Sequence, residues 1–567
     1  CINTISKMFF HNFVYGFLTE NKWTLVIYIL IILIFFPLEA VALPKMYGGL
    51  FDRMKSGGTA DFWNIVDNIK QMNLPGSVAA VFITWFIIIL SYAFKHHLES
   101  KLAPKYMTYI RKILFEKTIN AFKENYADVK TGEYLSRMLE LMRNAKELFQ
   151  YTLNQFFPYL ISVLFTTGFI AYSNIDLGKV VVLSMVLCVI INYFGGNYLI
   201  DLIATRENYM NEVVNQGIQN SVDNLMNIYI NNESNNEIGK NHEAEEKGRE
   251  LMTHIMFSQN LVISTCHIIV GLAYGIGLVS IYNMVRKKQI TSAEAIVFVL
   301  ILGQFVSFNI DLNAGYIHNV VFKMGIIKAA EPFLENIFVE ETHRVNKSGI
   351  KTGNIEFKDI VFRYDQSSDE VLYDGLNLNI KGGTKNGITG RSGSGKTTLM
   401  KMLVGLYKPE DGKISIDGTD IASMDIDYLR ENVNYVNQKT QLFEETVLYN
   451  MKYGNDSLTE EEISAKLKKY NLHEVFSDLP GGVQADAGLA GGNLSGGMQK
   501  LTILMRGILK KGDIIVLDEP LAGLDQITIT KVIDMIIAET DGKTLLVITH
   551  DKAILPYMDR VVDINKL

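Results

Sequence analysis

The chain has 567 residues, of which 48% are hydrophobic, and its formal net charge is −7. This length exceeds one ordinary hydrophobic core and predicts two or more domains, while a positive mean hydropathy of +0.13 indicates a membrane segment. The acidic balance provides no basic surface for nucleic acid, which we exclude as a partner.

Six apolar runs in the first part of the chain are long enough to cross a bilayer as helices. They cover approximately residues 23–43, 78–94, 156–172, 180–200, 261–282 and 292–311. Lysines and arginines are dense from Lys95 to Lys130, after the second run, whereas Arg286, Lys287 and Lys288 lie in a loop on the opposite side. Because the first of these loops carries more positive charge, we predict that it is cytoplasmic and that both termini lie on the same side.

Polar, helix-compatible stretches follow the second and the fourth runs and predict helices that project beyond the bilayer. Glu39, His267 and Asp311 are ionisable groups at membrane depth, where such groups often mark a transport pathway. Contact with headgroups or with a neighbouring helix is the alternative for these residues. The small residues of the segment 271–275 predict close helix packing.

The composition changes after Phe338. A charged connector follows, and from Ile355 onward short β-rich runs alternate with helical ones. We therefore predict an all-α, six-helix transmembrane domain over residues 1–338, a linker over 339–352 and an α/β P-loop nucleotide-binding domain over 353–567. Cys1 stands in place of an initiator methionine, which leaves open that further sequence precedes it.

A glycine-rich string marks the nucleotide site. Its residues are Gly390, Arg391, Ser392, Gly393, Ser394, Gly395, Lys396, Thr397 and Thr398. Glycines let the backbone turn its amide hydrogens toward phosphate, and the helix that starts near Lys396 adds its positive end. Lys396 is then expected at the β- and γ-phosphates, and the Thr397 hydroxyl at Mg²⁺. The preceding strand, residues 384–389, is only weakly apolar for this position.

A second string supplies the carboxylates that phosphate chemistry needs. Residues 514–517 are continuously apolar, as a buried parallel strand is, and Asp518 and Glu519 follow directly. Mg²⁺ keeps several waters and takes few protein ligands, so Asp518 at the strand end is predicted to complete its site with Thr397. Glu519 is predicted to be the general base that activates water.

Together with Leu494-Ser495-Gly496-Gly497, these strings resemble the ATP-binding cassette family. The whole chain is similar to the exporter-type half-transporters of that family, in which six membrane helices precede one nucleotide-binding domain. The resemblance implies an ATPase coupled to transport, with ATP and Mg²⁺ as cofactors. It also implies that Tyr364 stacks on adenine, that Gln438 senses Mg²⁺ and that His550 is the switch histidine.

The resemblance further implies a site shared between two chains. Ser495 and Gly497 would contact the γ-phosphate held by the opposite subunit, Gly496 between them belongs to the same nucleotide-binding string, and Asp525 would cross the dimer interface. The segments 131–137 and 221–228 correspond to the places where the family couples its membrane domain to its nucleotide domain. Three departures from the exporter pattern are Met498, Leu489 and the string Pro520-Leu521-Ala522-Gly523, none of which removes a catalytic group.

From these observations we predict ATP-driven export or translocation of a substrate by alternating access of a dimer in a lipid bilayer. The second subunit is either another copy of this chain or a related half-transporter. An ATP-gated channel or regulator without pumping is the alternative, and an importer would normally keep its membrane and nucleotide subunits separate. The sequence does not identify the transported substrate.

Overall fold

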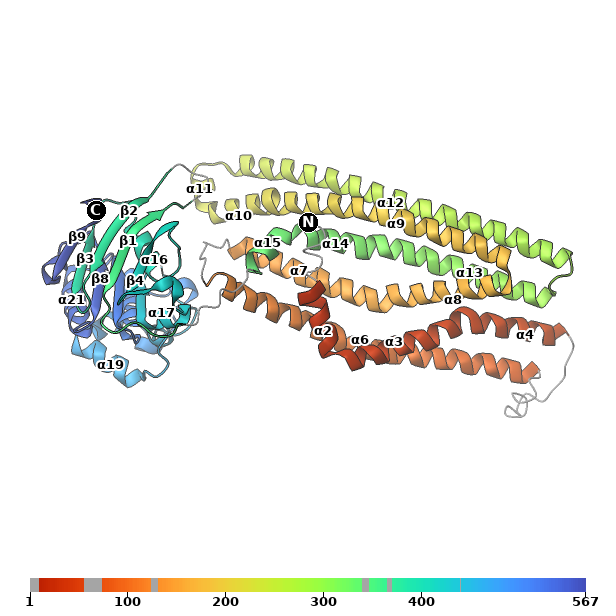
Figure 1. Cartoon of the computed structure of the whole chain (residues 1–567), viewed down its shortest axis with the longest axis horizontal. Coiled ribbons are helices and arrows are strands. Elements are labelled where there is room, and N and C mark those ends of the chain that lie inside the picture. The colour runs from red at the N-terminus through yellow and green to blue at the C-terminus, as the bar shows by residue number, and fades with distance from the viewer. Residues whose placement is uncertain are drawn as a thin grey trace. The chain divides into compact units, whose positions relative to one another are not determined.

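The structure is a computed structural model that describes residues 10–55, 74–123, 131–338, 346–364, 370–438 and 440–566. The chain divides into two compact units (Figure 1). The first comprises residues 1–118 and 129–338, and the second comprises residues 119–128 and 339–567. Cys1 and residues 339–345 of the predicted linker lie outside the described residues.

The first unit is built from long helices. Within the described residues, six helical segments of 33 to 53 residues are long and apolar enough to span a membrane, which confirms the six predicted spans. The helices are α2 (Gly16–Glu20), α3 (Lys22–Pro37), α4 (Leu43–Lys55), α6 (Leu74–Ala121), α7 (Thr131–Tyr151), α8 (Phe157–Ser173), α9 (Ile175–Tyr209), α10 (Gln216–Asp223), α11 (Leu225–Ile230), α12 (Ser234–Arg286), α13 (Ser292–Gly315), α14 (Phe322–Ala329) and α15 (Glu331–Ile337). Short π-helical turns join α3 to α4, α7 to α8, α9 to α10 and α13 to α14.

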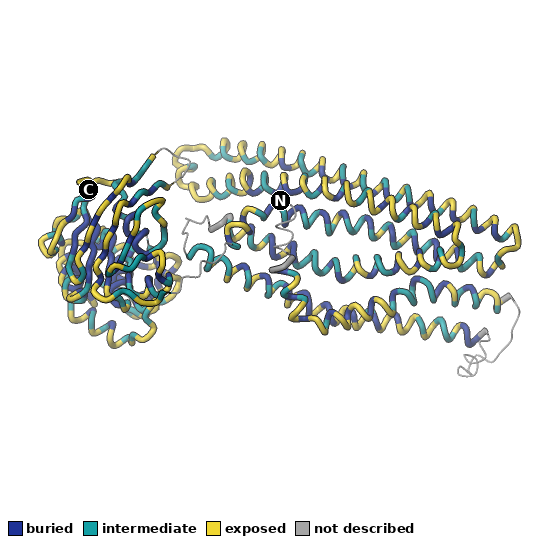
Figure 2. The backbone as a smooth tube through the Cα atoms, viewed as in Figure 1, coloured by how far each residue is buried: buried dark blue, intermediate teal, exposed yellow. Residues whose placement is uncertain are grey.

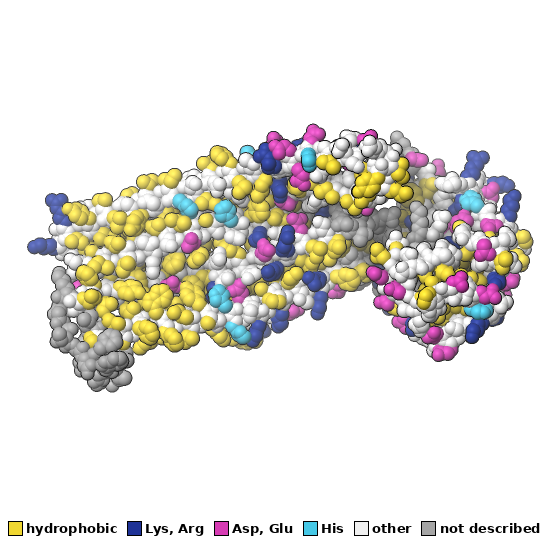
Figure 3. All heavy atoms as spheres, turned by 180° about the vertical axis from the view of Figure 1, so that it is seen from behind, with side chains coloured by type: hydrophobic (Ala, Val, Ile, Leu, Met, Phe, Trp, Pro, Cys, Tyr) yellow, Lys and Arg dark blue, Asp and Glu magenta, His cyan; other side chains and the backbone are white. Residues whose placement is uncertain are grey.

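These helices are longer than a bilayer requires. A span needs about 20 residues, whereas α12 has 53 and is therefore roughly 80 Å long. Hydrophobic side chains cover a broad band of the unit, and charged side chains gather toward the helix ends (Figure 3). Many of the exposed residues in this band are large and apolar, as lipid-facing residues are. Polar helix ends that extend beyond the apolar band agree with the predicted projections.

Helix packing occurs at different glycines from those predicted. A Cβ atom at Gly271 or Gly275 would meet nothing within 4 Å, so the expected packing at 271–275 is wrong within this chain. Close contacts occur instead at Gly277, where a Cβ would lie 2.4 Å from Leu302, and at Gly195, where it would lie 2.7 Å from Val262. The spacing of small residues predicts a close-packing face but not which side of the helix meets a neighbour.

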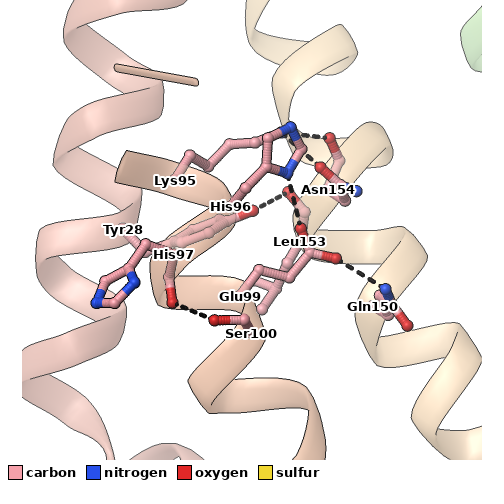
Figure 4. A network of polar contacts seen from close by, with 9 residues as sticks. All are labelled: Tyr28, Lys95, His96, His97, Glu99, Ser100, Gln150, Leu153 and Asn154. Atoms are coloured by element: carbon pink, nitrogen blue, oxygen red, sulfur yellow. Dashed lines mark hydrogen bonds and ion pairs between the residues drawn. The ribbon is translucent and has the colours of Figure 1, made fainter. Parts of the chain in front are cut away.

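A buried polar network joins α6 to α7 and to the π-helical turn that follows it (Figure 4). Lys95 is 3% exposed, and its Nζ donates to the carbonyl and side-chain oxygens of Asn154 at 3.1 and 2.5 Å. Glu99, also buried, accepts from Gln150 Nε2 at 2.9 Å and lies 3.3 Å from His96 Nδ1. Lys95 therefore bonds inside the bundle, although the sequence analysis counted it among the basic residues that mark the cytoplasmic side.

The second unit contains two sheets (Figure 1). The antiparallel sheet has the order β2-β1-β4-β5, and the other sheet, parallel throughout, has the order β6-β7-β8-β3-β9. The strands are β1 (Ile355–Phe362), β2 (Tyr373–Ile380), β3 (Lys385–Thr389), β4 (Asp411–Ile416), β5 (Thr419–Asp420), β6 (Val433–Val436), β7 (Ile514–Asp518), β8 (Thr544–Ile548) and β9 (Arg560–Asp563). The helices are α16 (Lys396–Leu403), α17 (Ile426–Asn432), α18 (Val447–Lys452), α19 (Glu460–Lys469), α20 (Gly496–Leu509) and α21 (Gln526–Glu539). An α/β unit after an all-α membrane unit is the predicted fold class.

Two hydrophobic cores lie on opposite faces of the parallel sheet. Ile514 and Val516 of β7 belong to one core, and Ile515 and Leu517 belong to the other. Because both faces are covered, every residue of the strand is buried. Figure 2 shows many such dark, buried stretches inside the second unit. The weakly apolar strand β3 is also internal to this sheet, where buried Asn386 is satisfied by donating its Nδ2 to Thr384.

Residues 119–123, at the end of α6 and just after it, belong to the second unit. Lys123 Nζ lies 2.5 Å from Asp427 Oδ2, and Arg430 donates to the Lys123 carbonyl oxygen at 2.5 Å. Lys123, Asp427 and Arg430 all belong to the second unit, so both contacts lie within it. Lys123 is therefore held by two residues of α17.

The side chain of Asp417 stabilises the start of the α/β unit through hydrogen bonds. Its carboxylate accepts backbone N–H bonds from residues 351 to 354 at 2.6 to 3.0 Å, and also the Thr352 hydroxyl. Burial acts to raise the pKa of Asp417, but the hydrogen bonds from Thr352 and from the backbone outweigh it and hold the pKa well below the usual value.

We expect Asp417→Asn to destabilise this unit by roughly 1–3 kcal/mol, because the charge-assisted bonds to backbone N–H groups are weakened. Since the folded-state pKa is depressed, this stabilisation is present above the unfolded pKa of about 3.9 and is lost as pH falls below it. Urea unfolding of the wild type and the variant at pH 7 and at pH 3 measures the difference. An unchanged gap between the two proteins at both pH values would contradict the assignment.

Candidate functional site

The phosphate loop connects β3 to α16. Gly390, Gly393 and Gly395 have φ values of 155°, 81° and 86°. A Cβ atom at Gly395 would lie 2.3 Å from the Tyr373 hydroxyl, so glycine is required there both by conformation and by space. Lys396 begins α16, and the free N–H groups of this helix end face the loop. The glycine turns and the helix start lie where the sequence predicted them, in a geometry that suits an anion.

Lys396 is held inside the loop. It is 7% exposed, and its Nζ donates to the carbonyl oxygens of Gly390 and Arg391 at 2.9 and 2.8 Å. Burial lowers the pKa of Lys396, while the charges of Glu519, Asp518 and Asp563 act to raise it. The ammonium thus stays within reach of any oxyanion that the loop binds.

Thr397 and Asp518 form the other side of the site. The Thr397 hydroxyl donates to Asp518 Oδ2 at 2.7 Å, and the Tyr435 hydroxyl donates to the same oxygen at 3.4 Å. Burial raises the pKa of Asp518, against the lowering effects of Thr397, Lys500, Tyr435 and Lys396. One hydroxyl and one carboxylate, with the Gln438 amide in the same pocket, fit a cation that takes few oxygen ligands.

Glu519 has a strained backbone. Its φ is 48°, in the left-handed region that a residue with a side chain seldom adopts. Its Oε1 lies 3.8 Å from His550 Nε2, and its Oε2 accepts from the Thr549 hydroxyl at 3.4 Å. Backbone strain of this kind persists where the surrounding structure fixes it, and it clusters at functional sites. The carboxylate is therefore fixed between the ends of β7 and β8.

A pocket of about 360 Å³ brings most of the predicted residues together. Its lining comprises Tyr364, Leu372, Ser392, Gly393, Gly395, Lys396, Thr397, Thr398, Gln438, Asp518, Glu519, Ile548 and His550. Tyr364 lies at its edge, where its hydroxyl bonds to that of Thr398 and its ring meets Phe362 and Tyr407 edge-on at 5.3 and 5.9 Å. Two-thirds of Tyr364 is exposed, so one ring face is open to a ligand.

Several predicted residues lie elsewhere in the unit. Ser495 caps α20 by accepting the Met498 N–H, with Gly496 and Gly497 in the first turn, and Asp525 caps α21. None of these four lines the pocket of its own chain. Gly390, Arg391 and Ser394 belong to the phosphate loop without lining the pocket, and the buried Ser394 hydroxyl has no hydrogen-bond partner among the described residues.

Sequence reasoning missed two groups next to Asp518. Tyr435 on β6 donates to the carboxylate, and Lys500 on α20 is a buried lysine. Burial lowers the pKa of Lys500, and the charges of Asp518 and Glu519 act to raise it. Lys500 lies three residues after Gly497, so its position next to the Leu494–Gly497 string could have indicated it. Tyr435 lies in no motif that would have indicated it.

The two segments expected to couple the membrane and nucleotide domains are helical. Residues 131–137 form the first turns of α7. Residues 221–228 span the end of α10, a break at Asn224 and the start of α11. Leu225, Met226 and Tyr229 near this break are exposed apolar residues. Of the membrane candidates, Glu39 accepts a hydrogen bond from Tyr92, and His267 Nε2 lies 3.4 Å from the Ile310 carbonyl oxygen on α13.

Comparisons with known proteins agree with this architecture. A model of the ABC transporter transmembrane region matches residues 26–307, and an ABC transporter model matches residues 373–522. A putative export ATP-binding/permease protein of Rickettsia felis is 25% identical over 89% of this chain and 88% of its own length. The ATP-dependent lipid A-core flippase of Saccharophagus degradans is 32% identical over 43% of this chain and 42% of that protein. The structure of a bacterial Atm1-family ABC exporter with ATP bound superposes with a TM-score of 0.81 at 22% identity, covering 96% of this chain and 93% of that one.

These features define an integral, multi-pass membrane protein with a fused ATP-binding domain. The chain belongs to the ABC transporter family, as an exporter-type half-transporter. It is an ATPase coupled to transport across a membrane.

Proposed function

We propose that this chain exports or translocates its substrate by alternating access of a dimer, driven by hydrolysis of Mg²⁺-bound ATP. The observation that carries this proposal is one pocket that contains Lys396, the Thr397–Asp518 pair and Glu519. The pocket belongs to a chain with six membrane-spanning segments. In this proposal, residues 1–338 form the transmembrane domain, 339–352 the linker and 353–567 the nucleotide-binding domain.

In this proposal, the role of each pocket residue follows from its position in the pocket. Tyr364 stacks on adenine with its open ring face, the loop 390–398 binds the phosphates, and Lys396 shifts from loop carbonyls to the β- and γ-phosphates. Thr397, Asp518 and Gln438 would hold Mg²⁺, and the bound ion would supply charge neutralisation for the phosphate oxygens. Glu519 accepts a proton from the attacking water as the general base. His550, 3.8 Å from that carboxylate, orients it and contacts the γ-phosphate.

A second chain completes the site in this proposal. Ser495, Gly496, Gly497 and Asp525 lie outside the pocket of their own chain, and the N-terminus of α20 has free N–H groups for a phosphate. These residues are therefore available to the nucleotide of a partner, either another copy of this chain or a related half-transporter. ATP would then close two nucleotide domains, and hydrolysis would separate them.

The dense positive charge of the segment after the second span supports a cytoplasmic nucleotide domain and cytoplasmic termini. Glu39 and His267 bond to neighbouring helices, and Asp311 is exposed on α13.

Transport in sealed vesicles tests the proposal against an ATP-gated channel. Candidate substrates are first found as compounds that stimulate ATP hydrolysis by the protein in lipid nanodiscs. In vesicles with outward-facing nucleotide domains, a pump is expected to accumulate such a compound above its external concentration when ATP and Mg²⁺ are added. Flux that stops at equal concentrations, or that persists with a non-hydrolysable ATP analogue, would favour the channel and overturn the proposal.

A further inference from the structure

A groove opens on the membrane unit between α8 and the segment that joins α3 to α4. Its volume is about 610 Å³. Apart from one lysine and the tyrosine hydroxyl, the side chains around it are apolar, and they include Val41, Phe165, Phe169 and Tyr172. Gly168 forms part of its floor, where an added Cβ would meet nothing within 4 Å. The groove is large enough for a small ligand and offers mainly hydrocarbon contacts.

Lys45 supplies the charge at this groove. Its Nζ lies 4.4 Å from the centroid of the Phe169 ring, a cation–π contact that holds the ammonium at the groove. Lys45 is exposed, and within the described part of the chain it forms no ion pair. Glu39, the acidic residue nearest in sequence, accepts a hydrogen bond from Tyr92 on α6. The positive charge of Lys45 is therefore available to a ligand.

The position of the groove along the helices limits its occupant. Pro37, Leu38, Val41 and Ala42 continue the apolar run of the first span, and Lys45 follows directly after it. A lysine and a tyrosine at the end of an apolar run are typical of the headgroup layer. The apolar part of the groove thus faces acyl chains, and its charged end faces headgroups.

We propose that this groove binds one anionic phospholipid of the surrounding bilayer. The acyl chain lies along Val41, Phe165 and the floor at Gly168, and the phosphate-bearing headgroup pairs with Lys45. The hydrocarbon fit accounts for binding of a lipid, and the single cation accounts for the choice of a negative headgroup. The site is independent of the transported substrate and does not require ATP.

Native mass spectrometry of the full-length protein, without nucleotide, tests the site. The protein is equilibrated with mixed micelles of phosphatidylglycerol or of phosphatidylcholine at matched acyl length. We expect one retained phosphatidylglycerol per chain and weaker retention of phosphatidylcholine. Lys45→Gln is expected to weaken phosphatidylglycerol binding about fivefold, the effect of one lysine near a charged headgroup, and to leave phosphatidylcholine unchanged. Gly168→Leu, which fills the groove, is expected to reduce retention of both lipids.

Matched variants separate the groove from general effects. Lys179→Gln removes an exposed lysine that is paired with Asp176 near the α8–α9 connection, and Gly271→Leu adds a side chain in open space on α12. Both should bind lipid as the wild type does. The proposal is overturned if the wild type retains the two lipids equally. It is also overturned if Lys45→Gln and Gly168→Leu bind lipid as these two control variants do. A change of oligomeric mass with Gly168→Leu, without loss of lipid, also overturns it, because the groove would then be an interface between copies. Lipid retention is measured without ATP, so it does not depend on transport. A protein that fails to transport can therefore still confirm or contradict the lipid site.

Discussion

Replacing Glu519 with glutamine is expected to lower kcat for ATP hydrolysis by roughly a hundred-fold to ten-thousand-fold, the range for loss of a general base. Glutamine keeps the shape of the side chain but cannot accept the proton of the attacking water. The backbone at φ 48° and the contacts at the end of β8 leave the side chain in the same place, so ATP binding should persist. Phosphate release at saturating ATP and Mg²⁺, with nucleotide binding measured separately, checks both expectations.

Glu461→Gln is the matched control for this change. Glu461 is an exposed glutamate on α19 and lies outside the pocket. Its substitution removes the same charge from the same unit and should leave kcat unchanged. If Glu519→Gln retained wild-type hydrolysis, the proposed general base would have to be reassigned. If it lost ATP binding as well, Glu519 would be acting on the structure of the pocket.

Two inactive variants are expected to restore each other when they share a dimer. Lys396→Ala removes the ammonium of the phosphate loop, and Ser495→Arg places a bulky cation at the α20 cap. If the sites are shared as proposed, a dimer of one chain of each kind has one composite site with an intact loop from one chain and an intact cap from the other. Heterodimers purified through two different tags should therefore regain about half of the wild-type ATPase rate if the two sites act independently.

The control is a heterodimer in which both substitutions lie on the same chain. A wild-type chain paired with a chain that carries both Lys396→Ala and Ser495→Arg has one damaged component in each composite site, and it should stay inactive. If each site were built within a single chain, this second heterodimer would be the active one. The comparison therefore distinguishes a shared site from a self-contained one with the same two substitutions.

The parts that sequence predicted are those with strong local signals. Six apolar runs define the spans because a bilayer sets a minimum length. Strand β7 was predictable because both of its faces are buried, so that every position is apolar. The phosphate loop was predictable because its backbone requires glycine at particular positions. The strands and helices in between then placed Asp518, Glu519 and His550 in one pocket.

The features that sequence reasoning missed depend on partners far along the chain. Lys95 was counted among the basic residues that mark the cytoplasmic side, but it donates two hydrogen bonds to Asn154, fifty-nine positions later. Tyr435 reaches Asp518 only because β6 and β7 pair in the sheet. The glycines at 271 and 275 face open space because helix rotation depends on neighbouring helices. None of these contacts has a periodicity or composition that would reveal it in advance.

The carbonyl contacts of Lys396 predict competition between nucleotide and inorganic oxyanions. An oxyanion that enters the loop offers the ammonium charged acceptors in exchange for the neutral oxygens of Gly390 and Arg391, and charge-assisted hydrogen bonds are the stronger ones. Sulfate and inorganic phosphate satisfy this requirement as well as a nucleotide tail does. We expect sulfate or phosphate in the buffer to compete with ATP at the loop and to raise the apparent KM for ATP. The affinity for ATP should therefore be measured in buffers whose anion is chloride.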